Sequence, residues 1–460
     1  MEVIKDERVK KIIDKIQEYI KLTRFNGHVY LVGGCVRDSL LNQPIKDVDV
    51  VVETKCGGMV LANLLAVREK CFLNGTNPVL FPTYGTAKVN LFKDADLKNL
   101  DIEFVDTKST FEEYEVNNAT IEEDSKLRDL TINSLYYNIT DGKLYDFNQG
   151  LNDLTTQTLR TVNPNLVFAK DPIKMLRIIR FSCELGWDIE KDTWLGIILN
   201  ASKIKDVPQE KISLELTKIL TSPNPSMGIR KLLYCGMLNK IMPDIYDLNN
   251  AYESRNPMVT TFDHTMEVLD TVQPLIENRL AALFHDVASV VSGNYNKSIT
   301  RDAFSAEVAA DDLKGMKFSH DVIKSVETAI KYHRIFRIYA DGITPPDKKI
   351  RKFINLCGTD IGTVIDLMNA NNLHQTYDKK KRQVLDILNR IEELDEIEQI
   401  QNVKLPINGG DIMRHLGMKR GNPTVGILLE KVKDAYFENP NITKEECLKI
   451  VDEEVKVLAV

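Results

Sequence analysis

Two aspartates separated by one apolar residue carry the clearest chemistry in this sequence. Asp47 and Asp49 lie in the run DVDVVVE, where the alternation of side chains along a strand sends both carboxylates to one face and Val48 into the core. Two such carboxylates can share divalent cations about 3.5 to 4 Å apart, one activating an attacking hydroxyl and the other steadying a leaving pyrophosphate. Hard oxygen ligands of this kind suit Mg²⁺. The pair therefore predicts metal-dependent nucleotidyl transfer.

A glycine pair precedes the two acids. Gly33 and Gly34 follow the short apolar strand expected at Tyr30 to Val32 and precede a segment with helical spacing at 36–41. Backbone amides of such a turn, together with a helix N-terminus, could meet a triphosphate. Taken alone, an Asp-x-Asp is usually solvated charge and a Gly-Gly is usually a turn. In the order strand, turn, helix, strand, the two motifs together favour a functional site.

A second strand is expected to bring further acids to the same place. The run LDIEFVD at 100–106 alternates in the same way and sends Asp101 and Glu103 to one face. We expect Glu103 to be the third metal carboxylate. The alternative is a strand face that is merely solvated.

Two later segments offer groups for the rest of a nucleotide. After the acids of TIEEDSK, Arg128 could act as a fixed cation near phosphate, and Asp129 could accept a ribose hydroxyl. The run KDPIKMLRIIRFSCELGW at 170–187 is expected to start as a helix whose Asp171, Lys174 and Arg177 recur every three residues on one face. Such a face could read the edge of a base, although surface ion pairs would give the same pattern.

The elements that must position these groups change character along the chain. The first ~140 residues alternate apolar strands with helices, which indicates an α/β head, and everything after them looks helical. Turn and loop signals mark breaks near 150–165, 221–228, 252–262 and 404–411. We therefore expect four regions, namely a head at 1–150, a neck at 151–255, a third helical region at 256–345 and a tail at 346–460.

Composition fits a large enzyme. The 460 residues correspond to about three domains by length, and 43% of them are hydrophobic, which is ample for several cores. No apolar run reaches the ~18 residues of a membrane span, and the N-terminus is a charged amphipathic helix rather than a signal peptide, so we expect a cytoplasmic protein without a membrane role. Seven cysteines without CxxC spacing favour reduced thiols and argue against a zinc site.

The net charge of -7 does not indicate a nucleic-acid-binding protein. Local clusters of basic residues would therefore have to supply the affinity for RNA. Two basic runs, PDKKIRKF at 346–353 and DKKKRQ at 378–383, could contact phosphates without reading sequence. The RNA-binding candidates are Lys348, Lys349, Arg351, Lys379, Lys380, Lys381 and Arg382. Solvated basic faces are an equally good reading of both runs.

The third region contains residues that could form a different kind of site, that of a metal-dependent hydrolase. His264 and the pair His285 and Asp286 are similar to the opening of an HD phosphohydrolase site, where histidines and aspartates bind a divalent metal. The following run ITRDAFSAEVAADD has no histidine where further ligands are expected, and His333 could be an incidental helix residue. A degenerate HD-like scaffold is therefore favoured over an active hydrolase.

Taken in order, these motifs resemble the class II tRNA nucleotidyltransferase family, the CCA-adding enzymes, which share their head and neck with bacterial poly(A) polymerases. The likeness is carried by GGCVRD with DVD, EFVD, EEDSKLRDLTINSLYYN, DPIKMLRIIRF, FDHTMEVLD with ALFHDVA, and GGDIMRHLGM with VGILLEKVKDA. It implies an α+β fold: an N-terminal polymerase-beta-type nucleotidyltransferase head, built from a mixed sheet with helices, and then an all-helical neck, body and tail.

The resemblance also implies roles for particular residues. Asp47, Asp49 and Glu103 look like the metal ligands and catalytic acids of the family. The nucleotide-binding set would be Gly33, Gly34, Arg37, Arg128, Asp129, Asp171, Lys174, Arg177 and Arg180.

The chain departs from the family pattern at three positions. Leu127 replaces the first arginine of an RRD motif, and Lys170 and Lys174 replace the acid and the arginine of the base-reading EDxxR. Because lysine lacks the planar fork with which arginine pairs bidentately, nucleotide choice is the property that these exchanges affect most.

The function implied is template-independent addition of C, C and A to the 3′ end of tRNA from CTP and ATP, with Mg²⁺ as cofactor and no protein partner. A poly(A)-type or relaxed-specificity RNA 3′-tailing enzyme is the first alternative, suggested by the two lysines. An HD-type metal-dependent phosphohydrolase and a non-catalytic tRNA-binding protein are the others.

Overall fold

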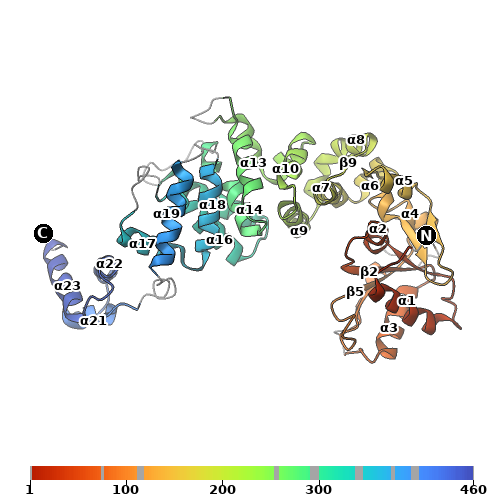
Figure 1. Ribbon diagram of the computed structural model, residues 1–460, viewed down its shortest axis with the longest axis horizontal. Helices are drawn as coiled ribbons and strands as arrows, with labels where there is room; N and C mark the ends of the chain where they lie inside the picture. The colour runs from red at the N-terminus through yellow and green to blue at the C-terminus, as the bar shows by residue number, and fades with distance from the viewer. Residues whose placement is uncertain are drawn as a thin grey trace. The chain divides into compact units, whose positions relative to one another are not determined.

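The structure is a computed structural model of the chain, and it describes every residue except 1–2, 74–76, 111–118, 253–257, 291–299, 337–344, 374–378, 395–403 and 459–460. The chain divides into two compact units, Met1–Ile241 and Met242–Val460, which are described one at a time (Figure 1). The four-region division expected from the sequence remains a prediction.

The first unit is built around a mixed sheet of seven strands in the order β3-β4-β5-β2-β1-β6-β7. Its strands are β1 Val29–Val32, β2 Asp47–Val52, β3 Val79–Phe81, β4 Thr86–Asn90, β5 Asp101–Asp106, β6 Leu135–Asn138 and β7 Leu144–Asp146. Strand β2 pairs in parallel with β5 and antiparallel with β1, and the other neighbours are antiparallel. The sheet confirms the predicted mixed-sheet head.

The sequence of β2 suits the middle of this sheet. Val50, Val51 and Val52 are fully buried, as β-branched residues are in a strand covered on both faces. The strand loses that cover at its beginning, where Asp47 is exposed and Asp49 is half-buried. The acids therefore lie where the central strand begins, at the edge of the hydrophobic core.

Helices pack on the sheet and continue into the rest of the unit. The helices are α1 Glu7–Ile20, α2 Gly34–Leu40, α3 Gly57–Arg68, α4 Ile121–Ser125, α5 Gly150–Thr155, α6 Pro164–Lys170, α7 Ile173–Leu185, α8 Lys191–Asn200, α9 Gln209–Leu220, α10 Pro225–Tyr234 and α11 Leu238–Ile241, with 3₁₀ turns η1 Pro82–Tyr84, η2 Thr131–Asn133 and η3 Ala201–Asp206. Helix α3 packs on β4 and β5, and α1 packs on α3. The amphipathic N-terminal helix is confirmed, because α1 buries one apolar face through Val9, Ile12 and Ile16.

The expectation that everything beyond the head is helical was wrong in one detail. Two short strands, β8 Thr158–Leu159 and β9 Asp188–Ile189, pair in parallel on either side of α6 and α7. Each has two residues, which is too short for a period-two pattern to be visible in the sequence. The pair closes the α6–α7 segment into a loop of chain whose ends are hydrogen-bonded.

The second unit is helical in its described residues. Its helices are α12 Pro243–Asp247, α13 Thr261–Thr271, α14 Ile276–Phe284, α15 Arg301–Gly315, α16 His320–Tyr332, α17 Asp347–Cys357, α18 Ile361–Leu373, α19 Lys379–Glu393, α21 Gly409–His415, α22 Pro423–Glu438 and α23 Lys444–Leu458, with 3₁₀ turns η4 Leu248–Asn250, η5 Val287–Ser289 and η6 Gly358–Asp360. Helices α14, α16 and α18 pack on one another, and α21, α22 and α23 share a smaller core around Leu428 and Val432.

The cysteines and helices agree with the expectations from composition. All seven cysteines are free thiols, and Cys35 is buried as a small hydrophobe whose Sγ donates to the Val32 carbonyl at 3.1 Å. No helix among the described residues is both long enough and apolar enough to cross a bilayer.

Candidate active site

The predicted acids come from two strands that lie side by side. In the parallel pairing of β2 with β5, Asp49 is opposite Glu103 and Asp47 is opposite Asp101. Since side chains directly opposite one another point to the same face, the four carboxylates form two rows on one face of the sheet. Val48 is fully buried on the other face. The expectation that the second strand adds acids beside the first pair is confirmed.

The glycine turn lies directly against Asp49. Gly33 precedes α2 with a φ of +75°, a conformation that L side chains rarely adopt. A Cβ built at Gly33 would stand 2.8 Å from Oδ2 of Asp49, closer than real Cβ atoms approach an oxygen. Gly33 is therefore required twice, once by its backbone and once by the carboxylate beside it. Gly34 begins α2 and has no such clash.

The electrostatics of Asp49 favour a bound cation. The pKa of the Asp49 carboxyl is raised to about 6, mainly by burial; Arg128 lowers it, and Glu103 and Asp47 contribute to the rise. Lys88, which is opposite Glu103 on β4, places its Nζ 3.5 Å from Oε2 of Glu103. A carboxylate that is partly desolvated among other carboxylates gains most from a metal ion, so the residues present fit a divalent cation.

The side chains of Asp47, Asp49 and Glu103 are not close enough to one another to share one metal ion as they stand. Among the described residues, only one set of three ligating groups has all its candidate ligand atoms within 4.8 Å, and that set is His264, His285 and Asp286 in the second unit. In the head, Asp47, Asp49 and Glu103 do not form such a set, and Oε2 of Glu103 lies 3.5 Å from Nζ of Lys88. Like charges in one place repel, so such carboxylates converge when a cation joins them.

A pocket of about 460 Å³ opens beside the acids. It is lined by Lys46, Asp47, Lys88, Asn90, Lys98, Asn99, Asp101 and Glu103. Three lysines and three carboxylates around one pocket suit a ligand that carries both phosphate oxygens and cations.

Arg128 is fixed behind the acids. Its Nε donates to Oδ2 of Asp124 at 3.0 Å and to the hydroxyl of Tyr136 at 2.9 Å, and that hydroxyl donates to Asp124 at 2.6 Å. The positive charge of the guanidinium lowers the pKa of the Asp49 carboxyl and so opposes the effect of burial. A cation held in this way can meet a phosphate without first being ordered.

Asp129 and Arg177 form an ion pair between the head and α7. Oδ2 of Asp129 accepts from Nε of Arg177 at 2.8 Å, and Oδ1 accepts from Nδ2 of Asn133 at 3.1 Å. Burial raises the pKa of the Asp129 carboxyl, but Arg177 and Asn133 outweigh burial and hold it well below its usual range. Asn133 also accepts from Nη1 of Arg37 at 2.7 Å, so Arg37 belongs to the same network.

The predicted helix face of Asp171, Lys174 and Arg177 was wrong for Asp171. Helix α6 ends at Lys170, Asp171 is its extended C-cap, and α7 begins at Ile173. Pro172 explains the break, because the residue before a proline is pushed out of the α conformation. Lys174 is on α7, where its Nζ donates to the carbonyl of Leu127 at 2.7 Å and lies 3.6 Å from Asp171.

Arg180 lies on α7 one turn beyond Arg177 and faces other helices. Its Nε is 2.8 Å from Oε2 of Glu215, its Nη1 donates to Glu184 at 3.1 Å, and its guanidinium stacks 4.2 Å from the ring centroid of Phe181. These contacts give Arg180 a packing role, and its nucleotide-binding role stays a prediction.

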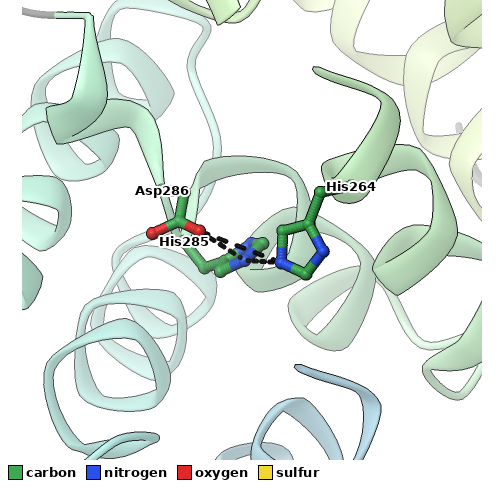
Figure 2. Close-up of side chains that lie close together, drawn as sticks. All are labelled: His264, His285 and Asp286. Carbon is green, nitrogen blue, oxygen red and sulfur yellow. Dashed lines mark hydrogen bonds and ion pairs between the residues drawn. The ribbon is translucent and has the colours of Figure 1, made fainter. Parts of the chain in front are cut away.

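The three residues of the predicted HD-like site lie close together in the structure. His264 on α13 lies against His285 and Asp286, which directly follow α14, and all three are buried (Figure 2). His333 was interpreted as incidental, but it is buried with its ring 5.7 Å from that of His285. That interpretation was wrong, because the helical packing brings together residues 48 positions apart.

The basic runs of the tail are partly engaged within the protein. Nζ of Lys348 is 2.8 Å from Oε2 of Glu438, and Nη1 of Arg351 donates to the carbonyl of Phe437 at 3.1 Å, so both hold α17 against α22. Lys349 is exposed. The side chains of Lys379, Lys380, Lys381 and Arg382 lie outside the described residues.

Three further residues contact the site but were not predicted from the sequence, namely Lys88, Asn133 and Tyr136. Lys88 is recognisable only once β4 is known to pair with β5. Asn133 and Tyr136 lie within the quoted run that contains Arg128, but nothing in their spacing shows which cations they contact.

Two family models match the N-terminal half of the chain. The poly A polymerase head domain matches residues 29–160, and the probable RNA and SrmB-binding site of polymerase A matches residues 186–248. The first range holds the sheet, the acids and Asp129. This part of the chain is therefore a nucleotidyltransferase head of the poly A polymerase class.

Comparison with individual proteins shows which members of this class the chain resembles. The chain is 26% identical to the CCA-adding enzyme of Ligilactobacillus salivarius over 99% of its own length and 100% of that protein. It is 32% identical to the multifunctional CCA protein of Pasteurella multocida over 57% of its own length and 63% of that protein, which is less than two thirds of that relative. The crystal structure of the Bacillus stearothermophilus CCA-adding enzyme in complex with CTP has the same fold, with a TM-score of 0.68 at 19% identity over 99% of this chain and 100% of that one. Over its whole length the chain is thus similar to CCA-adding enzymes, and its residues 29–160 match the poly A polymerase head domain.

Proposed function

We propose that this chain is a template-independent tRNA nucleotidyltransferase that adds C, C and A to the 3′ end of tRNA from CTP and ATP. The observation that carries the proposal is the pairing of Asp49 with Glu103 across β2 and β5, with Gly33 against the Asp49 carboxylate. The acids lie on one face of two adjacent strands, the side-chain-free turn lies against Asp49, and a pocket lined by Asp47, Glu103 and three lysines opens beside them.

Asp47, Asp49 and Glu103 would hold the divalent metal, which we propose to be Mg²⁺ because all three ligands are hard carboxylate oxygens. When bound, such ions activate the 3′ hydroxyl of the RNA and neutralise the leaving pyrophosphate. The protein supplies the anionic cluster, and the repulsion within it favours binding of a cation over closure without one.

Gly33 leaves room beside Asp49 for the triphosphate, and Arg128 supplies a fixed positive charge toward it. The Asp129–Arg177 pair holds the start of α7 against the head, and in this proposal Lys174 and Arg177 read the nucleotide base from there. In this role Asp171 acts from the bend between α6 and α7 and not from a helix face.

The RNA substrate would be held outside the head by the later helices, through phosphate contacts and shape. A cytoplasmic location, where tRNA is processed, is part of this proposal.

A relaxed-specificity tailing enzyme is the second candidate, and Lys174 is the observation that favours it. Its ammonium group is committed to the Leu127 carbonyl at 2.7 Å. A lysine in this position offers a base edge fewer directed donors than an arginine fork would.

The identity of the product separates the two candidates. Purified protein is incubated with tRNA that lacks its terminal CCA and with each labelled NTP, and the 3′ ends are sequenced. We expect C to be added before A and addition to stop after one A. Continued addition of A, or equal use of all four nucleotides, would instead establish the tailing enzyme.

Lys174→Arg tests how the base is read. The longer planar fork should sharpen the preference for CTP and ATP over UTP and GTP by about tenfold, the equivalent of roughly 1.4 kcal/mol. The measurement is kcat/KM for each nucleotide, with Lys231→Arg, on α10, as the matched exchange. Unchanged ratios would mean that position 174 does not face the base.

A further inference from the structure

The face of the sheet that carries the acids continues past them onto an apolar edge. Asp49 on β2 is opposite Glu103 on β5, and Glu103 is opposite Lys88 on β4. Lys88 is in turn opposite Val79 on β3. Because directly opposite side chains point to the same face, these residues form one row, and Phe81 joins that face two positions further along β3. The row therefore begins with carboxylates and ends with two apolar side chains.

Strand β3 leaves its apolar side chains uncovered. Val79, Leu80 and Phe81 are 37%, 41% and 39% exposed, so neither face of the strand is packed into the core. A single exposed apolar residue needs no explanation. Three in succession, beside a pocket that is lined by the acids, favour an interaction surface.

The edge is unsuited to pairing with a strand of another protein. Among the described residues β3 is the last strand of the sheet, it has three residues, and it lies between Pro78 and Pro82. Proline has no backbone N–H to donate to a neighbouring strand, and short strands with prolines protect a sheet edge from further pairing. The partner that fits is one that lies flat on the side chains and does not need the backbone.

The two sides of Asp49 differ in what they offer a substrate. On one side Asp49 is opposite Val32 on β1, and Gly33 lies against its carboxylate. In the proposed function the triphosphate lies at this glycine turn, so pyrophosphate leaves on the side of β1. The attacking and leaving oxygens of a phosphoryl transfer are roughly in line, so the 3′ hydroxyl of the RNA approaches from the other side, past Glu103.

The apolar edge is within reach of an RNA end held in this way. Strands β5 and β3 are two strand spacings apart, which is about 10 Å. One nucleoside spans that separation, so an RNA whose 3′ hydroxyl is at Glu103 places its last base over β3. Lys88 lies between the two, where the phosphate of that nucleotide needs a cation.

We infer that Phe81, with Val79 beside it, is the platform on which the last base of the RNA stacks while its 3′ hydroxyl is held at the acids. The inference rests on the proposed function and names the part of the RNA that the head contacts. Every base has a flat face that an aromatic ring can cover, so such stacking tolerates any sequence. That tolerance suits an enzyme whose RNA substrate ends in a different base after successive additions.

The test uses tRNA that ends in one C followed by the fluorescent base 2-aminopurine. Stacking on an aromatic ring quenches this base, and the anisotropy of a dye at the 5′ end shows when all the RNA is bound. At saturation we expect quenching, relative to free RNA, with the wild type and Phe81→Tyr, and its loss with Phe81→Leu. Leu80→Ala is the matched control, because Leu80 is similarly exposed on the other face of the same strand, and it should quench like the wild type.

Steady-state kinetics with unlabelled tRNA that lacks CCA give a second measurement. Phe81→Ala should lower kcat/KM for the tRNA by about 5- to 100-fold, which is the loss of one base–aromatic stack, and leave KM for CTP unchanged. Leu80→Ala should change neither value. An equal effect of both variants on the two substrates would mean that β3 only supports the sheet, and would overturn the inference.

The fluorescence measurement needs no turnover, so it separates this inference from the proposed function. A wild type that quenches the bound base but incorporates no nucleotide would remove the proposed function and keep the platform. Quenching that persists in Phe81→Leu, or none in a wild type that incorporates nucleotides, would overturn the platform and keep the function. Self-association in sedimentation that Phe81→Ala abolishes, without any quenching, would instead assign the edge to a second copy of the chain.

Discussion

At the scale of single residues, Asp49 is the group on which the proposed reaction depends most. Asp49→Asn keeps the shape and removes the charge that would hold the metal. We expect nucleotide incorporation to fall by at least roughly 100-fold, since even the loss of an outer-layer partner of a metal site costs 10- to 100-fold. The measurement is kcat/KM with tRNA lacking CCA, and Asp141→Asn, in the turn between β6 and β7, is the control. Equal loss in both variants, or none in Asp49→Asn, would remove Asp49 from the site.

The same carboxylate predicts how stability varies with pH. Because the pKa of Asp49 is raised to about 6 from 3.8, the folded protein binds a proton more tightly than the unfolded chain. The cost of holding the charge is therefore absent below pH 3.8, grows as the pH rises and is complete above about 6. In buffer without divalent metal, Asp49→Asn should stabilise the protein at pH 8, with a ceiling of about 3 kcal/mol, and have little effect near pH 4. Denaturant melts at the two pH values measure this, and adding Mg²⁺ at pH 8 should shrink the gap by stabilising the wild type.

The residues that could be recognised from the sequence are those whose environment is set by their own strand. Asp47 and Asp49 alternate with valines, and their common face follows from that alone. The same holds for Glu103 on β5. Lys88 and His333 could not be placed, because each acquires its role from a partner on another element, at Glu103 and His285 respectively. The positions of the acids are thus a local property, whereas their electrostatics depend on tertiary structure.

At the scale of elements, the bend between α6 and α7 shows what the three-residue spacing concealed. The spacing of Asp171, Lys174 and Arg177 is helical. Pro172, however, keeps Asp171 out of the α conformation, so that α7 begins only at Ile173. Pro172 is visible in the sequence, and its effect on the conformation of the preceding residue predicts the start of α7 better than the three-residue periodicity does. The two-residue strands β8 and β9 gave no periodic signal at all.

Helix α7 contacts the head through the ion pair of half-exposed Arg177 with buried Asp129, and this predicts a stability effect. Arg177→Met leaves the carboxylate of Asp129 buried with only Asn133 as a side-chain partner, and we expect a loss of about 2–4 kcal/mol in the free energy of unfolding. Adding Asp129→Asn should restore at least half of the loss, because the uncompensated charge is then gone. Lys126→Met, which breaks an exposed pair with Glu122, should cost less than about 0.5 kcal/mol. Urea melts compare the four proteins, and an Arg177→Met loss as small as the control would show that the pair is well solvated.

At the scale of the whole molecule, a net charge of -7 means that RNA must be held by local clusters. The ion pair of Lys348 with Glu438 makes part of the first basic run structural. We therefore expect Lys348→Ala to leave the salt dependence of tRNA binding unchanged. Lys380→Ala, in the second run, should reduce the slope of log K against log salt by roughly 0.7–0.9 if it removes one phosphate contact. Fluorescence anisotropy at several salt concentrations measures both slopes, and a reduced slope in Lys348→Ala would show that this face of α17 binds RNA after all.

The parallel pairing of β2 with β5 also has a consequence for biosynthesis. The two strands that carry the acids are not consecutive along the chain, and the segment between them includes α3, β3 and β4. A nascent polypeptide that ends before Asp101 lacks β5 and so cannot place Glu103 opposite Asp49, however well β1 and β2 have already associated. During translation, the proposed metal site therefore cannot form before β5 has left the ribosome, so a released fragment that ends before β5 lacks Glu103, the third proposed ligand.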